Sequence, residues 1–158
     1  MAAAQSANRS GKDFILATVI AYEIQCRLCD AASLRKYGWD HVTYGAFSAS
    51  LGAAKLWGLS VDEMIHAQGL AGVCNIATRQ TRTGQISMWK ACAFSNAARN
   101  ALFATNLARQ GFTGPHEIFE GPKGVFKMLT GGRVDVRLGS KAAGYMINKT
   151  YIKFWPAE

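Results

Sequence analysis

Residues 83–110 of this 158-residue chain read TGQISMWKACAFSNAARNALFATNLARQ, and Gly111 follows them. Alanine and other good helix formers dominate the stretch, so it predicts one long helix from Met88 to the end of the stretch. Gly111 stands where a glycine commonly follows the last helical turn. Ser87 has the side chain of an N-cap residue, which would make Lys90 the third helical residue.

Lys90 is a cation at an unfavourable place for one, because the third helical position favours Glu or Gln and the helix dipole disfavours a positive charge there. The free amides of a first helical turn bind anions, and a lysine beside them would add a full charge to such a site. Arg79 and Arg82 lie in the loop just before the helix. Their side chains suit carboxylates, so we interpret the three cations as a carboxylate-binding cluster. The alternative is that Lys90 points into water, at a cost of roughly 0.3 kcal/mol.

The preceding part of the chain has mainly helical patterns. Apolar residues at spacings of three and four predict a well-buried helix over residues 13 to about 35. Small residues crowd the next predicted helix, over 44–57, and permit close helix packing. Ser60 and Glu63 form a capping box that opens a third helix, which ends near Val73.

The last third of the chain carries weaker signals. Pro115 predicts the start of one short helix. Another is expected between the Gly-Pro-Lys-Gly at 121–124 and the Thr-Gly-Gly at 130–132. From Lys149 the sequence is β-prone and stops at Pro156. The predicted fold class is therefore all-α, a multi-helix bundle with a short C-terminal strand.

The composition limits the class of protein. Hydrophobic residues make up 49% of the chain, enough for about one globular domain. The formal net charge of +8 attracts anions, but the basic residues form no run or stripe, so we expect no nucleic-acid partner. The apolar run at 14–22 is too short to span a bilayer, and residues 1–12 do not resemble a leader. We expect a cytoplasmic protein with no membrane partner.

Neither a metal site nor a cofactor site is predicted. Cys26 and Cys29 have C-x-x-C spacing, but no second pair follows, and Cys74 and Cys92 are isolated. We interpret all four as reduced, mostly buried thiols. The glycine-rich nucleotide-binding motifs are missing, so no nucleotide cofactor is expected.

His41 is the best of the three histidines as a candidate for proton transfer. It lies in a turn-like segment between two predicted helices, where a side chain can project into a cleft. An ordinary surface histidine is the alternative, and His66 and His116 are expected to be structural. Residues 87–90 match the S-x-x-K motif of penicillin-recognising enzymes, but the companion motifs are missing, so we interpret this match as accidental.

Six blocks of the sequence, in this order, resemble the MmgE/PrpD family. They are GWDHVTYGAF at 38–47, AAKLWGLS at 53–60, AQGLAG at 67–72, MWKACAFSNAARNA at 88–101, GFTGP at 111–115 and FEG at 119–121. Ordered blocks along most of a chain are far more specific than any single motif. This family contains 2-methylcitrate dehydratase and cis-aconitate decarboxylase.

The resemblance implies a cofactor-independent lyase that acts on a small tricarboxylate, with a helical main domain and a homodimeric state. Its catalytic residues would be His41, Lys90 at the start of the long helix, and Lys153 before a proline. The implied reaction eliminates water from a hydroxy-tricarboxylate such as 2-methylcitrate, after a base removes the proton next to a carboxylate. Arg79 and Arg82, inferred from charge and position, would bind the substrate.

Members of the family also have an upstream helical segment and a downstream lid domain that this sequence does not match. We therefore expect the middle of a longer enzyme, with a polar lead-in at 1–12, a partial helical domain at 13–144 and the start of a connection to an absent lid domain at 145–158. The alternative is a non-catalytic helical module that pairs with a second copy or another subunit through exposed apolar surface.

Overall fold

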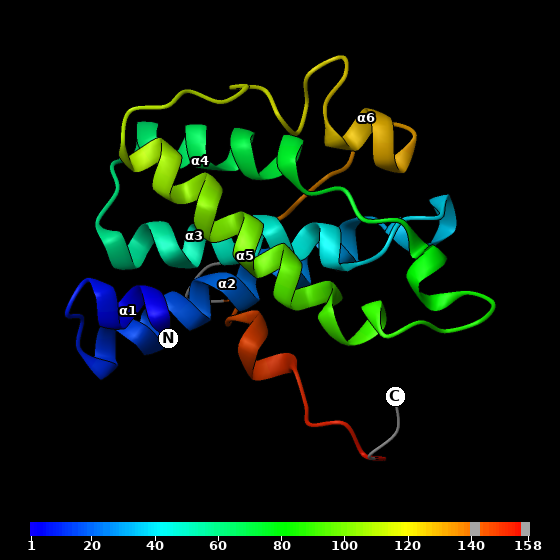
Figure 1. Ribbon diagram of the computed structural model, residues 1–158, viewed down its shortest axis with the longest axis horizontal. Helices are drawn as coiled ribbons and strands as arrows, with labels where there is room; N and C mark the ends of the chain where they lie inside the picture. The colour runs from blue at the N-terminus through cyan, green and yellow to red at the C-terminus, as the bar shows by residue number, and fades with distance from the viewer. Residues whose placement is uncertain (140–142, 156–158) are drawn as a thin grey trace.

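The computed structural model describes residues 1–139 and 143–155, which form a bundle of helices (Figure 1). Its α-helices are α1 (Ala2–Ser6), α2 (Gly11–Ala31), α3 (Val42–Trp57), α4 (Val61–Cys74), α5 (Trp89–Arg109) and α6 (Val125–Thr130). Short 3₁₀ helices follow α2, α4 and α6, namely η1 (Leu34–Tyr37), η2 (Arg79–Arg82) and η3 (Met146–Lys149). Among the described residues the only β pairing is a single bridge between Trp39 and Thr78. The predicted all-α fold is confirmed.

Helix α3 is the centre of the bundle. In Figure 1 it lies between α2 and α4, and α5 crosses it. Most of its residues are buried, including Tyr44 and Phe47. Its small residues allow close packing, as predicted, because a Cβ added to Gly52 would lie only 3.3 Å from the Ala17 carbonyl oxygen of α2.

The prediction that Pro115 starts a short helix is wrong. The segment after α5 crosses α4 as a series of turns and packs against two glycines of that helix. A Cβ added to Gly69 would overlap the backbone of Gly114 and Pro115, and one added to Gly72 would overlap Ile118. This close backbone approach leaves no room for the side chains that a helix would place between the two segments.

The helix starts agree with the sequence in one case and differ in another. The predicted capping box of α4 is confirmed, since the Ser60 hydroxyl accepts from the Glu63 amide at 3.2 Å and the Ser60 amide donates to Glu63 Oε2 at 2.6 Å. The prediction of Ser87 as an N-cap is wrong. Helix α5 begins at Trp89, so Lys90 is its second residue, because the residue after Ser87 already has helical backbone angles. The carbonyl oxygen of Ser87 accepts from the Lys90 amide at 3.2 Å.

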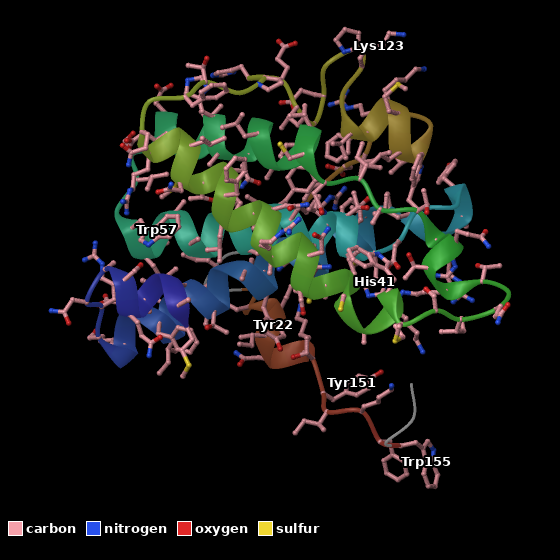
Figure 2. The ribbon with its side chains drawn as sticks, in the orientation of Figure 1. Tyr22, His41, Trp57, Lys123, Tyr151 and Trp155 are labelled. Carbon is pink, nitrogen blue, oxygen red and sulfur yellow. The ribbon has the colours of Figure 1, made fainter. Side chains whose placement is uncertain are left out.

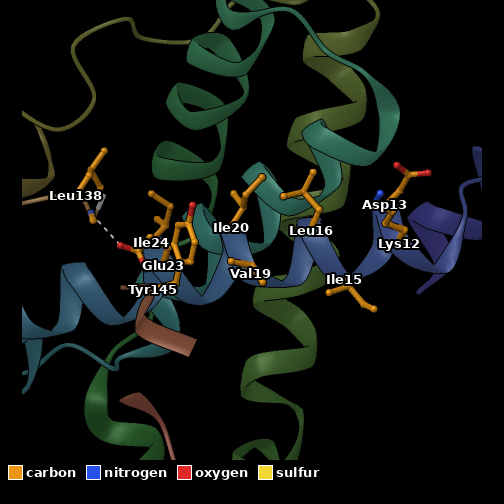
Figure 3. Close-up of a pocket in the computed structure, with 11 residues that line it drawn as sticks. Lys12, Asp13, Ile15, Leu16, Val19, Ile20, Glu23, Ile24, Leu138 and Tyr145 are labelled. Atoms are coloured by element: carbon orange, nitrogen blue, oxygen red, sulfur yellow. Dashed lines mark hydrogen bonds between the residues drawn. The ribbon is translucent and has the colours of Figure 1, made fainter. Parts of the chain in front are cut away.

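The prediction of a well-buried first helix is also wrong. Helix α2 buries only Ala17 and Leu28 fully. One side of it packs against α3, and the opposite side contributes to an open, apolar groove of about 630 Å³ (Figure 3). Residues of α2 that line this α2 groove include Ile15, Leu16, Val19 and Ile20. Hydrophobic spacing marks the apolar side chains of a helix but not the number of neighbours that cover them. In the part of the chain that the structure describes, no helix combines the length and apolarity needed to cross a bilayer.

Glu23 of α2 fastens the C-terminal part of the chain to the bundle. Its carboxylate accepts hydrogen bonds from the amides of Gly139 at 2.9 Å and Met146 at 2.7 Å, and it pairs with Arg27 at 2.8 Å. Helix η3 therefore lies against α2.

The predicted C-terminal strand is wrong. Lys149 ends η3, and residues 150–155 form neither helix nor strand. A strand needs a neighbouring strand for its backbone hydrogen bonds, and the described ranges contain none next to this segment. Pro156, where the strand was expected to stop, lies outside the described residues.

Candidate functional site

Asp40 is the centre of the candidate site. It precedes α3 and has no solvent-exposed surface. Its Oδ1 atom lies 2.9 Å from His41 Nδ1 and accepts from the Val42 amide at 3.3 Å, while its Oδ2 atom accepts from Arg82 Nε at 2.7 Å. A buried charge needs such partners, and here they come from the start of a helix and from the loop before α5.

His41 lies directly before α3, in the turn where the sequence placed it. Its side chain is 55% exposed, so the ring is held by Asp40 on one side and remains open to solvent on the other. Burial lowers the pKa of His41 below its ordinary value of 6.5, and although Asp40 raises it, the Arg82 and Arg79 charges lower it further. The ring is therefore neutral at pH 7, the state in which a histidine can accept a proton.

The loop that carries the two arginines is fastened to the turn around Asp40. The Asp40 amide donates to the Ala77 carbonyl oxygen at 2.8 Å, and the Ala77 amide donates to Thr43 Oγ1 at 3.0 Å. One step further along, the Arg79 amide donates to the Gly38 carbonyl oxygen at 2.8 Å. These bonds fix where η2 lies, and with it the backbone of both arginines.

Lys90 lies at the start of α5, which packs against the start of α3. Ala93 and Ala97 of α5 form a buried cluster with Val42, the residue after His41. Lys90 is three and seven residues before these alanines and therefore shares their face of the helix. The side chain of Lys90 is partly exposed. Because Val42 follows His41 and packs against Ala93 and Ala97, the start of α5 lies at the same end of α3 as His41 (Figure 2).

Lys153 is not brought to the other predicted site residues. It lies on the exposed segment 150–155. Figure 2 shows that Tyr151 and Trp155, on either side of Lys153, lie on a segment that runs away from the helices and from His41.

The sequence pointed to four residues at this end of the bundle but missed Asp40 and Thr43. Both side chains are fully buried and both bond to the loop at 77–82. The available signal was the order Asp-His at 40–41 before a helix, because Asp is a favoured residue next to free helical amides. Placing the start of the helix at residue 44 rather than Val42 concealed that signal.

The thiols are more exposed than predicted. Cys26 is partly exposed, and Cys29, Cys74 and Cys92 are exposed, which corrects the expectation of mostly buried thiols. All four are unpaired with each other. Small residues rather than the cysteines fill the contacts of α5, so Cys92 lies on its outer face. Within the described ranges, no group of three or more His, Cys, Asp or Glu side chains is placed to hold a metal ion.

The α2 groove is a poorer match to a polycarboxylate than the Asp40 site. Ile, Leu and Val side chains form most of its wall. A polyanion loses its hydration without compensation on such a surface. The end of the bundle that carries His41, Arg79, Arg82 and Lys90 has more cations than the wall of this groove.

Comparison with known proteins agrees with the resemblance in sequence. Residues 1–137 match the MmgE/PrpD N-terminal domain. The chain is 35% identical over 128 residues to the cis-aconitate decarboxylase-like protein oryM of Aspergillus oryzae, a match that covers 78% of this chain and 26% of that protein. It is 34% identical over 135 residues to a cis-aconitate decarboxylase of Aspergillus terreus, covering 82% and 27%. The chain thus spans about a quarter of the length of these relatives. Since the domain match extends over most of its length, the chain belongs to the MmgE/PrpD family.

Proposed function

We propose that this chain forms the part of a cofactor-independent lyase that binds a tricarboxylate and transfers a proton. The observation that carries the proposal is the His41–Asp40–Arg82 contact at the start of α3, beside the helix start that carries Lys90. Cations grouped near one imidazole suit a polyanion that has an acidic C–H bond. Membership of a family that includes lyases supports this chemistry.

Each residue has a proposed role. His41 transfers the proton through Nε2, because Asp40 occupies Nδ1. Arg79 and Arg82 bind substrate carboxylates, and Lys90 stabilises the negative charge that develops when a carbon next to a carboxylate loses its proton. Lys153 is a further proposed catalytic residue, and its participation requires residues 150–155 to lie closer to His41 than they do here.

The proposed reaction is dehydration of a hydroxy-tricarboxylate such as 2-methylcitrate. A proton leaves the carbon next to a carboxylate, and the hydroxyl on the neighbouring carbon leaves with a proton as water, which forms a double bond. Decarboxylation of a cis-aconitate-type acid is the second candidate reaction, and the names of the two relatives favour it. Both reactions develop negative charge next to a carboxylate, so the same cations serve either one.

The test measures binding and turnover of both acids. The chain, and a version extended at both ends to the length of its relatives, are titrated calorimetrically with 2-methylcitrate and cis-aconitate, and products are followed by NMR. We expect Lys90→Ala and His41→Ala each to lower turnover about 100-fold. The matched control is Lys127→Ala on α6, an exposed lysine outside the site. Turnover that survives both site substitutions would overturn the assignment of the site.

Self-association is the second candidate function, and the α2 groove is the observation that favours it. Ile15 is 65% exposed on this face of α2, and a second copy that covered it would remove apolar surface from water. We propose a homodimer formed through this face. Ile15→Glu should then produce monomers in sedimentation equilibrium, whereas Val61→Glu, at a still more exposed position on α4, should not. Dimers that persist in Ile15→Glu would place the contact elsewhere, and dimers without any tricarboxylate binding would favour the non-catalytic module.

A further inference from the structure

The carboxylate of Asp40 has more donors around it than a helix start requires. Two of its bonds, to the Val42 amide and to His41, are local, but the bond to Arg82 Nε comes from a residue 42 positions later. An ionised carboxylate can only accept hydrogen bonds. Each of its three partners must therefore supply the proton.

For His41 this requirement decides which ring nitrogen carries the proton. Nδ1, 2.9 Å from Asp40 Oδ1, must be the N–H nitrogen, so the neutral ring has its lone pair on Nε2. Free imidazole side chains in water favour the opposite tautomer, with the proton on Nε2. The buried carboxylate thus reverses the ordinary preference and leaves the accepting nitrogen on the exposed side of the ring.

For Arg82 the same carboxylate decides which part of the guanidinium remains available. Nε is bonded to Asp40, and within the described residues the terminal N–H groups of Arg82 have no protein partner. Those two groups form the edge of the guanidinium that binds a carboxylate in a bidentate way. One buried side chain therefore sets the orientation of an imidazole and of a guanidinium together.

We propose that Asp40 is a positioning residue: it holds His41 as the Nδ1–H tautomer, with Nε2 as the proton acceptor, and holds Arg82 with its terminal N–H groups towards the substrate. The consequence for catalysis rests on the proposed function, whereas the tautomer of His41 does not. Asp40 itself touches no substrate in this arrangement, because it has no exposed surface.

The charged groups around His41 provide a second test of the proposal, because they shift the pKa of His41 in opposite directions. Asp40 raises the pKa of His41, and Arg82 and Arg79 of η2 lower it. Lys90 at the start of α5 adds a further positive charge to this end of the bundle. Asp40→Asn should therefore lower the pKa of His41, and Arg82→Gln should raise it, because each removes one of these charges.

The experiment is nitrogen NMR of the full chain with ¹⁵N-labelled histidine, recorded across the titration of the rings. The signals of His41 are those that disappear in His41→Ala. In the unchanged chain we expect the Nδ1–H tautomer of His41 to predominate. Asp40→Asn should shift the population towards the Nε2–H tautomer and lower the pKa. Arg82→Gln should keep the Nδ1–H tautomer and raise the pKa of His41. Because this variant leaves Asp40 in place, it tests the proposal even where Asp40→Asn fails to fold.

A predominant Nε2–H tautomer in the unchanged chain would overturn the proposal, and so would a folded Asp40→Asn chain with the same tautomer and pKa. These outcomes need no substrate, so they are separate from failure of the proposed function, which appears as absence of tricarboxylate binding and turnover. Where turnover is present, Asp40→Asn should lower kcat about 100-fold, with a smaller change in KM, and move the acid side of the pH profile to lower pH. A rise in KM alone, with an unchanged kcat and an unchanged pH profile, would indicate a structural role instead.

Discussion

Tyr44 shows how burial changes the acid–base behaviour of one side chain. Its ring is almost fully buried, and its hydroxyl donates to the Ala32 carbonyl oxygen at 3.2 Å. Burial, with a smaller contribution from Cys29, raises the pKa of Tyr44 from 10.0 to about 12. The folded chain therefore keeps this proton at a pH where the unfolded chain has lost it.

The stability of the protein should consequently fall as the pH rises from 10 towards 12, while the contribution of Tyr44 is fully present below pH 10. Alkaline titration followed by tyrosinate absorbance checks this, with Tyr44→Phe as the control. The difference between the two titrations should show one tyrosine that ionises late. A difference curve centred at the ordinary pKa would contradict the prediction.

The residues of the candidate site were predictable to the extent that their signals are local. His41 between two helices and Lys90 in the first turn of α5 follow from residues near them in sequence. The pairing of Asp40 with Arg82 joins residues 42 positions apart, and no pattern in the sequence specifies it. Lys153 was assigned by resemblance, and Tyr151 and Trp155 on either side of it lie on a segment that runs away from His41 (Figure 2).

A buried pair of hydroxyls connects α3 to α5. Ser50 Oγ and Thr105 Oγ1 lie 2.9 Å apart with no exposed surface, and Thr105 also donates to the Ala101 carbonyl oxygen at 2.7 Å. Thr105→Val should cost about 1–3 kcal/mol in the free energy of unfolding, because it leaves the Ser50 hydroxyl buried without a partner. Ser50→Ala should cost less, since Thr105 keeps its bond to Ala101.

The double variant tests the coupling between these helices. Because Ser50→Ala removes the hydroxyl that Thr105→Val leaves unpaired, the two changes together should cost less than the sum of the single changes, by about 0.5 kcal/mol or more. Urea unfolding of the four proteins measures this cycle. Additive costs would mean that the two hydroxyls do not depend on each other.

The glycines of α4 are a second test at the level of elements. Gly69→Ala should destabilise the protein by about 1–3 kcal/mol, because the new methyl group overlaps backbone atoms of Gly114 and Pro115, which cannot move as freely as a side chain. Gly11→Ala in α2 is the matched control, since nothing lies within 4 Å of its Cβ position. It should leave the midpoint of urea unfolding unchanged or raise stability by about 0.5 kcal/mol. Equal effects of the two changes would show that the crossing over α4 is looser than described.

The elements that the sequence predicted well are those whose own residues determine them. The capping box of α4 and the small residues of α3 are local properties, and the helices of the first two thirds lie close to their predicted ranges. The predictions that were wrong depend on which other segments lie next to the segment in question. Neither the exposure of α2 nor the missing partner of the C-terminal strand is encoded in the segment itself, because both depend on what lies beside it.

At the scale of the whole molecule, Glu23 decides where the C-terminal connection lies. Burial acts to raise the pKa of Glu23, but the Met146 amide, Arg27 and the Gly139 amide outweigh it, so the pKa lies below the ordinary value of 4.5. A carboxyl group with a lowered pKa stabilises the folded state above its unfolded pKa and loses that effect as the pH falls. Acid should therefore weaken the attachment of this connection to α2.

Glu23→Gln should have a similar effect at neutral pH. We expect hydrogen exchange of the Gly139 and Met146 amides to become at least about 10-fold faster, while amides in α3 stay protected. Glu117→Gln, at an exposed position in the turns over α4, is the control with the same change of charge. Unchanged exchange in Glu23→Gln would mean that other contacts hold the connection.

The attachment at Glu23 also has a consequence for how the chain is made. Its hydrogen-bond partners lie 116 and 123 residues later in the sequence, and closing a loop of that length costs roughly 4 kcal/mol in chain entropy. A ribosome that adds about 5–20 residues per second needs roughly 6–25 s to reach Met146 after Glu23. During that interval the Glu23 carboxylate lacks the two backbone amides that donate to it in the folded chain. The attachment can therefore form only after all six described α-helices have been synthesised, so the C-terminal connection is the last part of the described chain to join the bundle.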